Sequence, residues 1–128
     1  MSKKIHFPVS LGEAIDKLTI LLVKSIKRPN SNSERLEETS AFAAIYDQIG
    51  ELLHAVLRHE LGLKLQKINT ALWGYEDMIR RAVRENDSET QLFASNKICA
   101  LNEERAVVKN QINKQWGFDE TDGKTYSK

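Results

Sequence analysis

The segment Ile98-Cys-Ala-Leu-Asn-Glu-Glu-Arg-Ala-Val-Val-Lys-Asn-Gln-Ile112 carries the pattern that decides the fold. Apolar residues recur in it every three or four positions, the spacing that places side chains along one face of an α-helix. Arg105 occupies one position of that face. A guanidinium cannot give up its charge, and burying it without a partner costs several kcal/mol. We therefore expect Arg105 to meet a carboxylate, water or a ligand where this helix packs on its neighbours.

The same periodicity extends over most of the chain. The sequence Ser10-Leu-Gly-Glu13 is typical of a helix start, in which the Ser10 hydroxyl accepts from the Glu13 amide and the Glu13 side chain reaches back. A change of phase and a glycine within 58–62 predict a break or sharp kink there. Asp87 or the serine after it is placed to cap the following helix. The predicted segments are an extended lead-in over 1–9, helices over 10–28, 33–58, 62–86 and 88–116, and a polar tail over 117–128.

The sequence therefore predicts an all-α fold, a single-domain antiparallel bundle of three to four helices with a short extended N-terminal segment. Three helices would result if the middle two run together. A chain of 128 residues is long enough for one sizeable hydrophobic core. Long amphipathic helices often share their core with a second copy, so a homodimer is one expectation.

Composition excludes several classes of function. Nineteen basic and eighteen acidic residues leave a formal charge of +1, so no overall field is available to hold a nucleic acid. The most apolar run, Leu18 to Val23, is too short for membrane insertion. One cysteine, Cys99, allows no intrachain disulfide, and the first residues do not resemble a signal peptide. We expect a cytoplasmic protein.

Charged and aromatic residues flank the apolar faces of three predicted helices, so that packing can bring them to one seam. Catalytic motifs are missing from these segments: there is no zinc-protease motif, no glycine-rich phosphate loop and no nucleophile elbow. The sequence predicts no cofactor and no bound metal. The candidate ligand-binding residues are Lys17, Lys24, Trp73, Arg80, Asn102, Arg105 and Lys109, and their candidate ion-pair partners are Glu13, Asp16, Glu76 and Asp77.

Three interpretations of this seam stay open. The first is a pocket in which Trp73 forms an apolar wall and the cations hold a small anionic or sugar-linked ligand, as in a binding or accessory protein. The second is a purely structural ion-pair network in a helical oligomerisation or interaction protein. The third is a Mg²⁺-dependent phosphohydrolase that uses carboxylates on facing helices. Glu76 and Asp77 are adjacent and point about 100° apart on a helix, which disfavours the third. Binding is expected rather than catalysis.

Three separated motifs resemble a known family. They are Pro8-Val-Ser-Leu-Gly-Glu-Ala-Ile-Asp-Lys-Leu-Thr-Ile20, Ile68-Asn-x-x-Leu-Trp-x-x-Glu-Asp-x-Ile-Arg80, and Asn102-x-x-Arg-Ala-x-x-Lys-x-x-Ile-Asn113 with a terminal Lys124-Thr-Tyr126. The chain resembles an uncharacterised bacterial family of small helical proteins, catalogued as a domain of unknown function. Some relatives are encoded near genes for surface-polysaccharide or glycosyl-transfer work, so the resemblance implies a sugar or sugar-phosphate context. It points to the candidate residues above, to Asn113, which shares the helical stripe of Asn102, Arg105 and Lys109, and also to Asn69.

Overall fold

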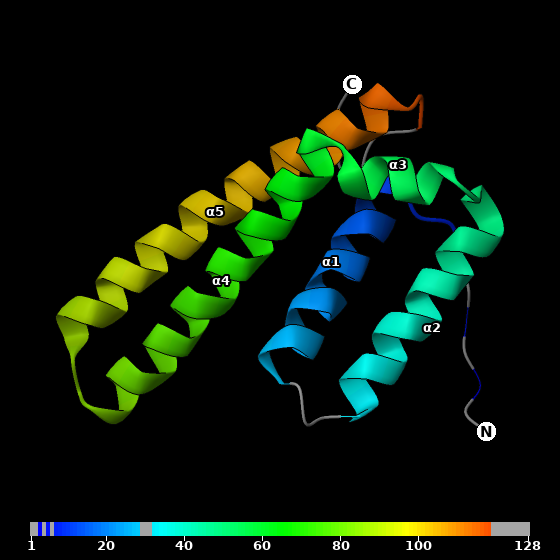
Figure 1. Cartoon of the computed structure of the whole chain (residues 1–128). Coiled ribbons are helices and arrows are strands. Elements are labelled where there is room, and N and C mark those ends of the chain that lie inside the picture. Colours follow the sequence, from blue (N-terminus) through cyan, green and yellow to red (C-terminus); the bar gives the residue numbers. More distant parts are fainter. Residues whose placement is uncertain (1–2, 4, 6, 29–31, 119–128) are drawn as a thin grey trace.

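In the computed structural model, all regular secondary structure of the described residues is helical (Figure 1), as predicted for an all-α chain. The structure describes residues 3, 5, 7–28 and 32–118, so the predicted tail beyond 118 and part of the predicted lead-in lie outside the described residues. Residues 7–10 carry no regular structure. The helices are α1 (Leu11–Lys27), α2 (Asn32–Ile49), α3 (Leu52–Arg58), α4 (Glu60–Arg84) and α5 (Ser88–Gln115).

The predicted number of helices is wrong, because the described residues form five rather than three or four. The predicted helix over 33–58 is divided after Ile49, where Gly50 adopts a left-handed φ of 61°. This backbone conformation ends helices and favours glycine, which lacks the Cβ that would clash. The three other predicted helices begin and end within two residues of the bounds observed.

The predicted break within 58–62 is confirmed. His59 leaves helical conformation, with φ −69° and ψ 153°, and its ring Nδ1 accepts from the Leu61 amide at 3.0 Å. Gly62 is buried in this corner, and a Cβ there would overlap the backbone of Val56. Glycine therefore allows α3 and α4 to meet at this angle.

Two helix pairs make up the molecule, as Figure 1 shows. The long helices α4 and α5 run side by side as a hairpin, and α1 and α2 form a second pair, with α3 lying across one end of both. Helix α1 packs against α4 and α5 as well as α2. The core lies along these contacts, with Ile15, Leu65, Val108 and Ile112 fully buried. In the described part of the chain, no helix is both long enough and apolar enough to cross a lipid bilayer.

Candidate functional site

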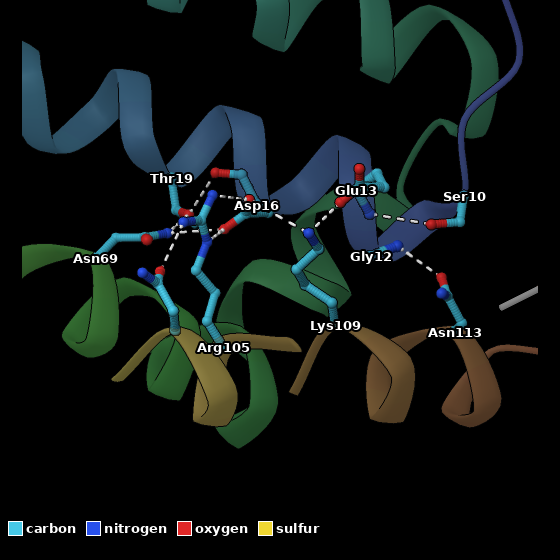
Figure 2. A network of polar contacts seen from close by, with 10 residues as sticks. Ser10, Gly12, Glu13, Asp16, Thr19, Asn69, Arg105, Lys109 and Asn113 are labelled. Atoms are coloured by element: carbon cyan, nitrogen blue, oxygen red, sulfur yellow. Dashed lines mark hydrogen bonds and ion pairs between the residues drawn. The ribbon is translucent and has the colours of Figure 1, made fainter. Parts of the chain in front are cut away.

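Asp16 lies at the centre of a polar network between α1, α4 and α5 (Figure 2). Its side chain is only 6% exposed. Arg105 donates from Nε to Oδ1 at 2.9 Å and from Nη2 to Oδ2 at 2.6 Å, which makes a bidentate ion pair. Of the three partners expected for Arg105, namely a carboxylate, water or a ligand, the structure shows a carboxylate.

Asn69 of α4 completes the surroundings of this carboxylate. Its Nδ2 donates to Asp16 Oδ1 at 3.1 Å and to Thr19 Oγ1 at 2.8 Å. The Thr19 hydroxyl in turn donates to the Asp16 backbone carbonyl at 2.9 Å. Because Asp16, Thr19 and Asn69 are all buried, these hydrogen bonds replace the water that the polar groups lose on folding.

The Asp16 carboxylate fixes the charge of Arg105. The hydrogen bonds to Asp16 raise the pKa of the guanidinium above its ordinary value; burial acts in the opposite direction and is outweighed, and the charges of Asp16, Glu13 and Glu76 add to the rise. The Arg105 side chain keeps 27% of its surface exposed, and its Nη1 donates to Asn102 Oδ1 at 3.3 Å. One edge of the guanidinium is therefore bound to Asp16 while the rest is accessible from the surface.

A second ion pair lies one helical turn away. Lys109 Nζ contacts the Glu13 carboxylate and lies 3.8 Å from Asp16 Oδ2. The predicted capping box is only half formed: Ser10 Oγ accepts from the Glu13 amide at 3.1 Å, while the Glu13 side chain pairs with Lys109. The two carboxylates and two cations of the network cancel.

The start of α1 is also bound to α5 through its backbone. The Gly12 amide donates to Asn113 Oδ1 at 2.6 Å, and both residues are buried. The Asn113 Nδ2 is buried without a hydrogen-bond partner among the described residues. This contact satisfies one of the amides that a helix N-terminus leaves free.

A small cavity adjoins the network on the side of Arg105. Its volume is about 120 Å³. The indole of Trp73 forms part of its wall, and the Arg28 guanidinium lies 5.0 Å from the centre of that indole. The ammonium group of Lys24 makes no hydrogen bond or ion pair with any residue that the structure describes, so its charge is available at the cavity. The lining residues are Ile20, Val23, Lys24, Asn69, Leu72, Trp73, Glu76 and Arg105.

The structure brings most of the predicted seam together, in two groups. Glu13, Asp16, Asn102, Arg105 and Lys109 belong to the network, and Lys24, Trp73 and Glu76 line the cavity beside it.

Three candidates lie outside both groups. Lys17 is exposed on α1. Arg80 and Asp77 pair with each other at 3.4 Å and are 54% and 59% exposed, so they form a local pair at the surface, apart from Asp16. The physical reason is their spacing of three along one helix, which favours a local pair at the surface.

Reasoning from helical spacing missed Thr19 and Gly12 but placed Asn113 on the stripe of Arg105, while Asn69 was reached only through the family resemblance. A polar residue within the apolar run from Leu18 to Val23 was the available signal for Thr19. Gly12 gave none, because what it contributes is the close approach of another backbone.

The residues that the structure describes do not include a group of three metal-ligating side chains. Among residues 3, 5, 7–28 and 32–118, no three carboxylate, imidazole or thiol side chains are grouped so that they could hold an ion. Both Asp16 oxygens accept from Arg105, so ligation by Asp16 would require that ion pair to open. The magnesium interpretation gains no support from this geometry.

Comparison with known proteins gives no match: no protein-family model, no curated protein and no solved structure is significantly similar to this chain.

Proposed function

We propose that this chain is a binding or accessory protein that takes a small anionic or sugar-linked ligand in the cavity between α1, α4 and α5. The observation that carries the proposal is the ammonium of Lys24, which no described residue pairs with, beside Trp73 and the accessible edge of Arg105. A free cation at a partly apolar cavity attracts an anion, since the low-dielectric wall strengthens the interaction.

The size of the cavity limits what can enter it. A volume of about 120 Å³ equals roughly four water molecules at ~30 Å³ each. This space suits one phosphate, carboxylate or sulfate group, with the rest of the ligand outside. Asp16 holds the guanidinium of Arg105 in one orientation, so little conformational entropy would be lost when an anion binds.

The remaining lining residues suit a sugar attached to that group. Trp73 presents an aromatic surface, against which the apolar face of a pyranose can pack. Glu76 and Asn69 can exchange hydrogen bonds with hydroxyl groups. A sugar phosphate, or the end of a nucleotide sugar, therefore satisfies both parts of the cavity.

The main rival is the structural network. The four charges of Glu13, Asp16, Arg105 and Lys109 pair with one another, which supports a role in fixing the helices and none in binding. Because Lys24 and Trp73 are outside this network, substituting them should remove ligand binding without disturbing the ion pairs that hold the helices together.

The test is a thermal-shift titration with inorganic phosphate, glucose 1-phosphate and UDP-glucose. Binding should raise the melting temperature, by mass action on the folded state. Lys24→Met and Trp73→Leu should each abolish the shift while leaving the unliganded protein folded. Lys67→Met is the matched control, because Lys67 is an exposed lysine elsewhere on α4.

Equal shifts in wild type and Lys24→Met would place binding elsewhere and contradict the proposal. The absence of a shift with every probe at millimolar concentration would favour the structural network.

A further inference from the structure

The α4–α5 hairpin has a second long face, away from α1, which no other described helix covers. Phe93 and Val107 of α5 expose 50% and 55% of their surface there. Between them a shallow groove of about 600 Å³ runs along α4 and α5, with Ala71, Tyr75 and Leu101 in its apolar lining. Exposed apolar side chains that gather along one groove are typical of an interaction site.

Along this face of α5, an apolar residue and a charged residue lie on each side of Ala100, and the two charges are opposite. Phe93 and Val107 lie seven residues before and after it, and Lys97 and Glu104 lie three before and four after. These residues recur every three or four positions, so they share one helical face. In a second copy of α5 that runs antiparallel, Val107 therefore lies at the level of Phe93, and Glu104 lies near the level of Lys97.

We propose that a second copy of this chain docks on this face, with the two α5 helices antiparallel and a two-fold axis beside Ala100. In this arrangement Lys97 faces the partner's Glu104 and Phe93 faces the partner's Val107. The small Ala100 at the axis lets the helices approach closely. A two-fold interface requires a surface complementary to itself, and the symmetric pattern with opposite charges provides one.

The available area is sufficient for a stable dimer. Helix α5 has 28 residues and is about 42 Å long at 1.5 Å per residue. Two helices about 9 Å apart present a face about 18 Å wide, so the face measures on the order of 800 Å². Specific interfaces bury about 800 Å² on each partner. This inference is independent of the ligand proposed above.

Charge reversal tests the register. Sedimentation equilibrium of the full chain should show a dimer that Lys97→Glu and Glu104→Lys each weaken at least tenfold, since each variant sets like charges opposite each other. The double variant Lys97→Glu/Glu104→Lys should restore the dimer. Lys17→Glu makes the same charge change at an exposed position of α1, outside the α4–α5 face, and should leave the dimer intact.

A cysteine provides a second readout. Ala100→Cys in a Cys99→Ser background should form a covalent dimer on mild oxidation, because the two positions meet at the axis. Wild-type Cys99 is exposed but points about 100° away, so it should crosslink much more slowly. A chain that stays monomeric at 200 μM, or a dimer unaffected by both single charge reversals, would overturn the proposal.

Discussion

Gly12 of α1 and Lys109 of α5 lie in direct backbone contact. A Cβ on Gly12 would overlap the Lys109 carbonyl oxygen and lie 2.9 Å from its carbonyl carbon. Because the neighbouring atoms belong to a helix backbone, they cannot move aside as a side-chain end could. Because Gly12 has no side chain, α1 can cross α5 at this short distance.

Gly12→Ala should lower the free energy of unfolding by about 1–3 kcal/mol, the cost typical of overpacking a closed contact. Urea denaturation followed by circular dichroism measures it. Gly74→Ala is the control, because Gly74 is an exposed glycine within α4 with no atom within 4 Å of its Cβ position. Alanine there should stabilise the helix by about 0.5–1 kcal/mol. Equal effects of the two substitutions would contradict the close contact.

Arg105→Met should destabilise the fold by about 3 kcal/mol, because it leaves the buried Asp16 carboxylate without its principal partner. Asp16→Asn/Arg105→Met should recover at least half of this loss, since the remaining amide is neutral and can still pair with Asn69. Denaturant melts of the wild type, both single variants and the double variant give the coupling energy. If the double variant is no more stable than Arg105→Met, the ion pair is not what Arg105 contributes.

Asp87 should make stability depend on pH at the start of α5. The hydrogen bond from the Thr90 hydroxyl is the largest cause that lowers the pKa of Asp87, followed by the Thr90 amide. A carboxyl whose pKa is lower in the folded state contributes stability above its unfolded value of 3.8, and this contribution is lost as the pH falls through the folded value.

The difference in the free energy of unfolding between wild type and Asp87→Ala should therefore be largest at pH 6–7 and decrease below pH ~4. Urea melts at each pH measure it. Asp47→Ala changes an exposed aspartate within α2, where it caps no helix, and should show no comparable decrease. A difference that stays constant down to pH 2 would show that the charge of Asp87 contributes nothing.

Gly50→Ala should cost about 1 kcal/mol, even though alanine is the better helix former. Gly50 has a φ of 61°, and the Cβ of an L-residue is strained there. Nothing lies within 4 Å of the added atom, so the cost comes from the backbone alone. Gly50→Asn should cost less, because asparagine tolerates this conformation. A stabilised Gly50→Ala variant would indicate that α2 and α3 can merge into the single helix that the sequence predicts.

Helical periodicity was sufficient to locate most of the elements. The stripe around Arg105 and the caps at Ser10 and Asp87 are local patterns, and their hydrogen bonds appear as expected. The break after Ile49 was missed because the apolar pattern continues through Gly50. Only the backbone angle of that residue distinguishes a continuous helix from two.

The sequence was sufficient to predict most residues of the site, but not which carboxylate pairs with which cation. The sequence shows that Arg105 requires a carboxylate, yet Glu13, Asp16, Glu76 and Asp77 are all suitable by charge. The choice of Asp16 follows from the angle at which α1 crosses α5, and that angle depends on Gly12 and Asn113 at the far end of the contact. Tertiary geometry decides the pairing, and periodicity within one helix carries no information about it.

The pairing of Asp16 with Arg105 spans 89 positions of the chain. During synthesis on the ribosome, residues 11–27 leave the exit tunnel long before position 105 exists. Until then the Asp16 carboxylate cannot pair with Arg105. Burying it among apolar side chains would therefore leave its charge uncompensated, which is unfavourable. The N-terminal helix pair should therefore stay loosely assembled on the nascent chain and close in one late step, when the residues that complete α5 emerge.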